Sequence, residues 1–250
     1  MDVARCLERI GYSGPTAPTL DNLRALQMAF LLTVPFENLD IHLGREIELF
    51  PESIYEKIVS RRRGGFCYEC NILFFELLNL LDFQVEYLSA RMLKGAAVGP
   101  EFDHMILLVT LEHDYLVDVG NGQSCREPLR IDGTDSATSE GYTYRVDSRG
   151  NDLALYYHQS NAAWKPRFLF TLTPRKRLEF LDMCYYHQTS PDSVFTQHRL
   201  ATIARVEGRV SLTDMRLVIT EGLDKKEMVL GSEKECLDVL KHCFGIVISS

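Results

Sequence analysis

The chain has 250 residues, of which 46% are hydrophobic and 25% charged, a composition typical of a globular protein and unlike a disordered or fibrous one. Its 27 basic and 35 acidic residues give a net charge of −8 without a basic stripe, so we expect no nucleic-acid partner. No window of about 18 residues is continuously apolar, so we expect no membrane span or membrane partner.

The N-terminus and the cysteines predict the compartment. The first residues, MDVARCLERIGYSGP, begin with an acid and read as an amphipathic helix, so we expect no secretory signal. The seven cysteines are odd in number and follow no scaffold spacing. We therefore expect reduced thiols and a cytoplasmic protein.

Residues 1–83 have the apolar period of helices. A helix capped by Asp2 stops at Gly11, a second covers residues 21–32, and a third begins at the capping-box pair Ser53 and Glu56. The fourth covers residues 67–81, where apolar residues leave little polar face, so we expect it to be buried.

The pattern after Phe83 is that of short strands separated by turn residues. The predicted strands cover residues 84–93, 104–111, 115–120, 142–146, 153–158 and 167–172. They indicate an antiparallel barrel or sandwich. Helical spacing returns at residues 175–186, and the chain ends with strands at 201–206, 209–212, 216–220 and 227–230 and a helix at 233–242. The fold class is therefore α+β.

The stretch RRRGGFCYECN, residues 61–71, places Cys67 after two glycines and at the start of the fourth predicted helix. Glycines permit a sharp turn and the close approach of a backbone or a ligand. Free N–H groups and the helix dipole favour a thiolate there and predict a lowered pKa for Cys67. The same N–H groups can stabilise an oxyanion. Cys67 is thus a candidate nucleophile.

Other roles for the cysteines remain open. Cys67 and Cys70 form C-x-x-C, which also suits a redox pair or half of a zinc site. No second C-x-x-C and no thioredoxin-like βαβ unit accompanies it, so we expect no metal site. Four further cysteines, at positions 6, 184, 236 and 243, suit small buried hydrophobic residues.

A nucleophilic cysteine needs a base and a group that orients the base. His104 begins one predicted strand, in FDHMILLV, and Asp118 lies near the end of the next, in YLVDVGNG. Because an acid in an apolar strand is costly unless paired, Asp118 calls for a partner such as a buried histidine. Taken alone, His104 also suits an ordinary imidazole and Asp118 a turn cap before Gly120.

Strand geometry leaves the pairing open. If the turn between the two strands is centred on His113, then His104 and Asp118 share a face but are offset by four residues, about 13 Å along a regular strand. A bulge, a bend or a turn centred nearer Leu111 would bring them together.

Five motifs in order carry a family resemblance. They are VPFENLDIHLGR, RRRGGFCYECN, FDH, VDVGNG and QTSPDSVFT, and together they span most of the chain. The sequence closely resembles the arylamine N-acetyltransferases. The chain has no room for the insertion that vertebrate members carry after the barrel, so the resemblance is to a bacterial type.

The resemblance implies a fold and a triad. The fold would be an N-terminal helical bundle (residues 1–83) with the nucleophile, a central antiparallel β-barrel (84–190) with His and Asp, and a C-terminal α/β lid (191–250). The triad, like that of papain-like proteases and transglutaminases, would be Cys67, His104 and Asp118. Glu69 and Asn71 recur in the family motif, and we interpret them as structural supports.

The implied activity is acetyl transfer from acetyl-CoA to arylamines, arylhydroxylamines or arylhydrazines by a ping-pong reaction through a cysteine thioester, a role in xenobiotic metabolism. The family implies Phe36 in the acceptor pocket, a position that also suits an ordinary core aromatic. It implies CoA contacts at Thr196 and Thr202, which equally suit strand or turn threonines.

Two positions depart from the family pattern, and two rivals share its fold. Asn121 stands where many members have an aromatic residue, which predicts a wider or more polar acceptor pocket, and Cys70 stands where many have Gln or Leu. One rival is an amide synthase that closes a macrolactam from a polyketide thioester, and another is a catalytically silent protein that binds CoA or an aryl ligand. A cysteine peptidase is a third alternative.

Overall fold

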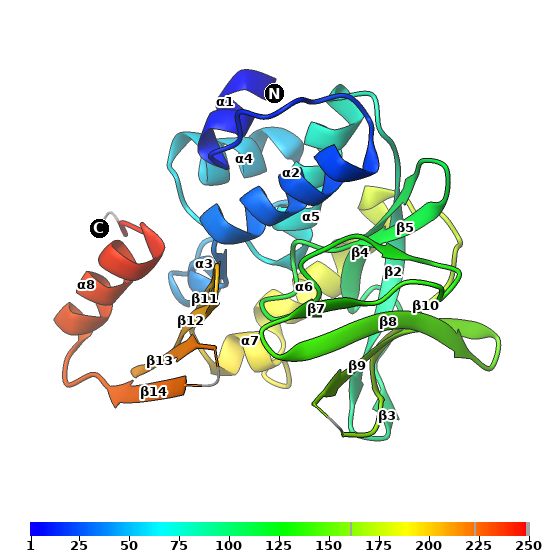
Figure 1. The fold of residues 1–250 in the computed structure, drawn as a ribbon. Helices are drawn as coiled ribbons and strands as arrows, with labels where there is room; N and C mark the ends of the chain where they lie inside the picture. Colours follow the sequence, from blue (N-terminus) through cyan, green and yellow to red (C-terminus); the bar gives the residue numbers. More distant parts are fainter. Residues whose placement is uncertain (161, 223, 249–250) are drawn as a thin grey trace.

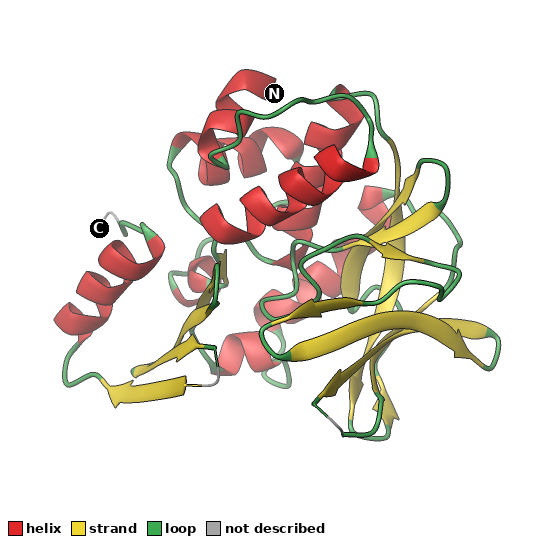
Figure 2. Cartoon of the chain, in the orientation of Figure 1, coloured by secondary structure: helices red, strands yellow, loops and turns green. Residues whose placement is uncertain are grey.

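The computed structural model describes residues 1–160, 162–222 and 224–248. Its parts are arranged around a common centre (Figure 1): N-terminal helices at the top, a strongly curved sheet on the right, and a smaller sheet covered by one helix on the left. Figure 2 shows that helices and strands are segregated along the chain rather than alternating. The predicted α+β class is confirmed.

The helical part contains α1 to α5. Their bounds are α1 Val3–Arg9, α2 Leu20–Thr33, α3 Leu39–His42, α4 Pro51–Tyr55 with the π-helical turn η1 Glu56–Ser60, and α5 Cys67–Leu80. Asp2 caps α1 as predicted, with its carboxylate accepting from the Arg5 N–H. The capping box at Ser53 is wrong, because Pro51 starts α4 and the Ser53 hydroxyl donates to Glu48 Oε2 at 2.6 Å.

Helix α5 is the buried centre of the helical part, as its all-round apolar pattern predicts. Its buried residues lie on every side of the helix and include polar ones: Cys67, Tyr68, Glu69, Cys70, Asn71, Ile72, Leu73, Phe74, Leu77 and Leu78. The other helices and the first strands of the curved sheet pack on it to form the largest apolar core. The start of α5 is therefore held rigidly in the middle of the molecule.

The curved antiparallel sheet has the strand order β6-β5-β4-β2-β10-β9-β8-β7, with β3 paired to β2, and closes nearly into a barrel. The bounds are β2 Gln84–Lys94, β3 Ala97–Val98, β4 His104–Thr110, β5 Asp114–Val117, β6 Leu129–Arg130, β7 Ala137–Ser139, β8 Tyr142–Arg149, β9 Asp152–Gln159 and β10 Lys165–Phe170. Each of the six predicted strands is present, but the prediction for residues 115–120 is wrong at its end, because β5 stops at Val117 and Asp118 lies beyond it. The two- and three-residue strands were not predicted, because so few residues cannot show the alternation of apolar and polar side chains that marks a strand.

The second sheet has the order β1-β11-β12-β13-β14. Its strands are β1 Phe36–Glu37, β11 Leu200–Arg205, β12 Gly208–Thr213, β13 Arg216–Glu221 and β14 Asp224–Val229. Helix α8, Glu233–Phe244, packs its apolar residues on one face of this sheet. Strand β1 was not predicted, and it joins the N-terminal helical part to the C-terminal sheet through Phe36 opposite Thr202.

Short helices connect the two sheets. They are η2 Arg177–Phe180, α6 Leu181–Thr189 and α7 Val194–Gln197. Asn38 ties this connection to the helical part, since its Nδ2 donates to the carbonyls of Phe195 and His198 at 2.9 and 2.8 Å. Within the described residues, no helix has the length and apolar character needed to cross a bilayer.

Candidate active site

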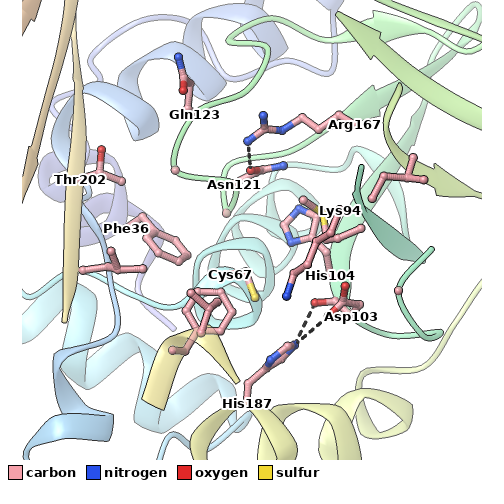
Figure 3. Close-up of a pocket in the computed structure, with 18 of the residues that line it drawn as sticks. Phe36, Cys67, Lys94, Asp103, His104, Asn121, Gln123, Arg167, His187 and Thr202 are labelled. Carbon is pink, nitrogen blue, oxygen red and sulfur yellow. Dashed lines mark hydrogen bonds and ion pairs between the residues drawn. The ribbon is translucent and has the colours of Figure 1, made fainter. Parts of the chain in front are cut away.

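A cavity of about 750 Å³ opens where the helical part, the curved sheet and the second sheet meet. Its wall includes Cys67 from α5, His104 from β4 and Thr202 from β11 (Figure 3). The volume falls within the range of small-molecule sites. Three segments far apart in the sequence thus contribute chemically active side chains to one space.

Cys67 is the first residue of α5, directly after the N-cap Phe66. The two glycines before it allow the close backbone approach that the motif predicted: Gly65 N–H donates to the Pro35 carbonyl at 3.0 Å, and Glu37 N–H donates to the Gly65 carbonyl at 2.9 Å. A Cβ on Gly64 would lie only 2.3 Å from the Pro35 carbonyl oxygen, so only glycine fits there.

The electrostatic surroundings of Cys67 differ from the sequence prediction. Only 4% of its surface is exposed, and burial raises the pKa of the thiol well above its ordinary value. The nearby thiols and the Asp118 carboxylate raise this pKa further. A backbone hydrogen bond from Tyr68 acts in the opposite direction. The predicted lowering of the Cys67 pKa by the helix start is therefore wrong, because desolvation outweighs the helix-start amides.

His104 and Asp118 are in direct contact. His104 Nε2 lies 2.9 Å from Asp118 Oδ2, and both side chains are about 5% exposed. Burial alone would raise the pKa of Asp118, but His104 and hydrogen bonds from Asn71 and Gly120 hold it below its ordinary value. Asp118 is therefore a buried carboxylate held in its charged form beside an imidazole.

Two further hydrogen bonds fix the second oxygen of Asp118. Oδ1 accepts from Asn71 Nδ2 at 3.1 Å and from the Gly120 N–H at 2.9 Å. Asn71 also accepts from the Val119 N–H at 3.1 Å. The interpretation of Asn71 as a support agrees with these contacts, since one residue of α5 holds the segment that presents Asp118.

Glu69 supports the helix start from the other side. Its Oε2 accepts from the Phe66 N–H at 2.7 Å, and Lys57 Nζ donates to both of its oxygens at 2.9 and 2.8 Å. Lys57 also contacts Asp40 at 2.7 Å, and Arg63 bridges Asp40 and Glu37. This buried charge network anchors the turn before Cys67.

The predicted pocket residues separate into two groups. Phe36, Asn121 and Thr202 line the cavity, whereas Thr196 does not. The Thr196 hydroxyl faces the turn before α7 instead, 2.7 Å from the Ser190 carbonyl and 2.9 Å from that of Ser193. The structure therefore brings Thr202 but not Thr196 to the space that holds Cys67.

Several lining residues escaped the sequence analysis. His187 of α6 is in direct contact with Asp103, with Nε2 3.3 Å from Asp103 Oδ1 (Figure 3). Arg167 of β10 and Arg209 of β12 also line the cavity. Each lies in an element with other polar residues, LDMCYYHQT, KPRFLF and GRVSLT, so the sequence carries no signal that singles it out.

Comparison with known proteins gives a consistent result. A model of the N-acetyltransferase family matches residues 19–250. The arylamine N-acetyltransferase of Mycolicibacterium smegmatis is 34% identical over 254 residues, covering 98% of this chain and 92% of the relative.

Solved structures agree with the sequence comparison. That of the arylamine N-acetyltransferase from M. tuberculosis superposes with a TM-score of 0.91 at 31% identity, covering 98% of this chain and 94% of the other. That of the Mycobacterium marinum arylamine N-acetyltransferase in complex with CoA gives a TM-score of 0.90 at 31% identity, covering 98% and 93% of the two chains.

Proposed function

This chain belongs to the arylamine N-acetyltransferase family and is an acyltransferase, and we propose that it transfers acetyl through a thioester on Cys67. The donor is acetyl-CoA, and the acceptors are arylamines, arylhydroxylamines or arylhydrazines. The observation that carries the proposal is the cavity shared by Cys67 and the His104–Asp118 pair. Transfer proceeds in two steps, with CoA leaving before the acceptor attacks.

In the first step the Cys67 sulfur attacks the acetyl carbonyl carbon and the thioester bond to CoA breaks. Because burial favours the neutral thiol, its proton must pass to a base, and His104 is the candidate. Asp118 engages Nε2 of that imidazole, which leaves Nδ1 to take the proton. Asp118 stabilises the imidazolium that results. The imidazolium then gives this proton to the departing sulfur, so CoA leaves as the free thiol and His104 is neutral again.

In the second step the amine nitrogen of the acceptor attacks the acetyl carbon on Cys67. His104 takes the proton that the amine loses and gives it to the Cys67 sulfur, which leaves as the amide forms. Both steps pass through a tetrahedral oxyanion, for which the unpaired N–H groups of the first turn of α5 are the candidate donors. One such donor is worth about 3–4 kcal/mol in well-studied cases.

The three parts of the chain have separate tasks in this proposal. Residues 1–83 supply the nucleophile, residues 84–190 supply His104 and Asp118, and residues 191–250 form the lid that completes the cavity. Thr202 is the candidate contact for CoA, whereas the position of Thr196 supports a structural role for that residue. Seven free thiols support a cytoplasmic setting.

The deciding experiment is the intact mass of the protein after mixing with acetyl-CoA and no acceptor. We expect one acetyl adduct on wild type and none on Cys67→Ala. Cys184→Ala, which removes a buried thiol that does not line the cavity, is the matched control and should still be acetylated. An arylamine or arylhydrazine should then discharge the adduct. A folded wild-type protein that gains no acetyl would refute the proposal and favour the amide synthase or the silent binder.

A further inference from the structure

Arg167 reaches the cavity because strand β10 contains a β-bulge. Pro166 pairs with Tyr156 and Phe168 with Leu155, so Arg167 is the extra residue between two consecutive pairs. A bulge of this kind redirects a side chain and is frequent beside active sites. The bulge thus explains how a cation in a barrel strand comes to line the cavity that holds Cys67.

Arg167 forms no direct ion pair with any carboxylate among the residues that the structure describes. Its Nη2 donates to Asn121 Oδ1 at 2.8 Å, and among the described residues no carboxylate lies within ion-pair distance of its guanidinium. Burial lowers the pKa of Arg167, and the charge of Asp118, which lies beyond ion-pair distance, opposes this only in part. Arg209, on the opposite wall, differs because it pairs with Glu140 at 2.7 Å. Arg167 therefore brings to the cavity wall a positive charge that no direct ion pair among the described residues neutralises.

Asn121 adds a second unused donor. The amide oxygen Oδ1 of Asn121 accepts from Arg167. The amide nitrogen Nδ2 is therefore the atom left to donate, and it is buried without a hydrogen-bond partner. An unsatisfied buried donor costs about 1–3 kcal/mol, so a ligand acceptor at this point would be favoured. Arg167 and Asn121 together offer donors and a positive charge to whatever binds here.

These donors lie near the reacting atoms. Gly120, next to Asn121, packs so closely on α5 that a Cβ there would be 2.4 Å from the Cys67 carbonyl oxygen. Phe168, next to Arg167, packs on the His104 ring with centroids 5.9 Å apart. Figure 3 shows Arg167 and Asn121 joined above Cys67 and His104.

We propose that Arg167, positioned by Asn121, binds a carboxylate on the ring of the acceptor, so that aminobenzoate-type arylamines are preferred over neutral arylamines. The inference rests on the proposed function, whose acceptor class it narrows. A guanidinium binds a carboxylate with two parallel hydrogen bonds. The phosphates of CoA are the less suitable anion, because the pantetheine arm separates them from the sulfur that must reach Cys67.

The test compares kcat/KM for 4-aminobenzoate and its neutral methyl ester. Arg167→Gln should lower the value for 4-aminobenzoate about 10- to 100-fold, as expected for a lost charged hydrogen bond, and change that for the ester less than about twofold. Arg167→Lys should recover part of the loss. Lys165→Gln, an exposed position in the same strand, is the matched control and should change neither value.

Two further measurements distinguish a carboxylate site at Arg167 from a phosphate site and from a purely structural arginine. If Arg167→Gln lowered kcat/KM equally for 4-aminobenzoate and its methyl ester, or for neither, the inference would be overturned. A raised KM for acetyl-CoA in the formation of the Cys67 adduct would also overturn it, because this result would assign Arg167 to the phosphates of CoA.

Titration of 4-aminobenzoate into the unacetylated proteins measures binding without chemistry. A wild type that binds the acid but forms no adduct would therefore refute the proposed function alone. Equal binding of the acid to wild type and Arg167→Gln would refute the inference alone.

Discussion

His104 Nε2 lies 2.9 Å from Asp118 Oδ2, although Asp118 lies beyond the end of β5 and the β4–β5 ladder does not pair the two residues. The β4–β5 ladder pairs Thr110 with Asp114 and ends at Leu107 opposite Val117, so its continuation would put His104 opposite Gly120. The contact forms because the chain leaves the ladder after Val117. Asn71 of α5 holds the departing segment through Asp118 and Val119, so the helix that bears Cys67 also sets the position of the carboxylate.

Asp118→Asn should abolish most activity with little loss of structure. The amide keeps the size of the side chain but removes the charge that orients and stabilises the His104 imidazolium. The equivalent change in a serine protease costs about 10⁴-fold in kcat. We expect the rate of Cys67 acetylation, measured by rapid quench and mass, to fall by a factor on the order of 10³ to 10⁴. Asp114→Asn, at the exposed start of β5, is the control, and a similar loss there would contradict the assignment.

The reactivity of Cys67 toward iodoacetamide should depend on His104. Burial raises the pKa of this thiol, so without a proton acceptor the thiolate should become abundant only well above the ordinary thiol pKa of about 8.5. His104→Gln should therefore be alkylated very slowly at pH 7, with a rate that rises only at strongly alkaline pH. Wild type should react faster than His104→Gln at pH 7, because His104 can accept the thiol proton as the sulfur attacks. Equal rates for the two proteins at pH 7 would remove His104 from this role.

The long elements could be predicted from the sequence, whereas the site contacts could not. The period of α5 and the double glycine before it placed Cys67 correctly at a helix start. The pKa of Cys67 was mispredicted because it depends on how much protein covers the thiol, which a local motif does not reveal. The turn centre, which the sequence left open between His113 and a position nearer Leu111, lies at Glu112, and the bend after Val117 depends on a tertiary contact with Asn71.

The place of Arg167 in the cavity wall could not be predicted from the sequence either. A bulge shifts the face on which later residues lie, and nothing in LALYYH or RFLFTL marks where the two strands slip by one residue. Strand β1 could not be predicted, because two residues are too few to show the alternation of a strand. It nevertheless brings Phe36 opposite Thr202 and so to the cavity wall. Tertiary pairing, not local propensity, decides these positions.

Lys57→Met should destabilise the protein without touching the cavity. Lys57 neutralises two buried carboxylates, Asp40 at 2.7 Å and Glu69 at 2.8 Å. Removal of one partner from a buried ion pair costs about 3–5 kcal/mol, because the remaining charge stays buried. Urea unfolding at pH 7 should report a loss of that order, and Lys241→Met on the exposed side of α8 should report almost none.

The same network predicts an acid dependence. Burial alone would raise the pKa of Asp40, but Lys57 and Arg63 hold it below its ordinary value. A carboxyl group with a lowered folded-state pKa stabilises the fold above its unfolded pKa of about 3.9, and this contribution is lost as the pH falls through the folded value. The contribution of Asp40 to the unfolding free energy should therefore be lost below about pH 4, and this loss should be smaller in Lys57→Met. An equal loss in both would contradict the coupling.

Alanine at Thr202 and at Thr196 should have different effects. Thr202 lines the cavity and accepts a hydrogen bond from Arg209 Nη1 at 3.2 Å, so Thr202→Ala should raise KM for acetyl-CoA about 3- to 10-fold, the value of one hydrogen bond. Thr196→Ala should leave KM unchanged and lower the unfolding free energy by about 1 kcal/mol, because it removes the bond to the Ser190 carbonyl. A raised KM in Thr196→Ala alone would reverse the two assignments.

Gly120 and Gly122 flank Asn121, and a methyl group at each tests a different feature of the site. A Cβ at Gly120 would lie 2.4 Å from the Cys67 carbonyl oxygen and 2.5 Å from Asn71 Nδ2, atoms that cannot move without shifting α5 and Asp118. Gly120→Ala should therefore unfold at lower urea and lose acetylation of Cys67. A Cβ at Gly122 would meet the Thr202 methyl at 3.0 Å and Phe36 at 4.0 Å.

Gly122→Ala should therefore keep its stability within about 1 kcal/mol, because only side-chain atoms must give way. The methyl group narrows the cavity between Asn121 and Phe36, so KM for an acceptor with two fused aromatic rings should rise more than KM for one with a single ring. Formation of the Cys67 acetyl adduct should stay near the wild-type rate. If Gly122→Ala instead slowed adduct formation and spared every acceptor, the space beside Phe36 would belong to the donor, and the place of Phe36 in the acceptor pocket would be wrong.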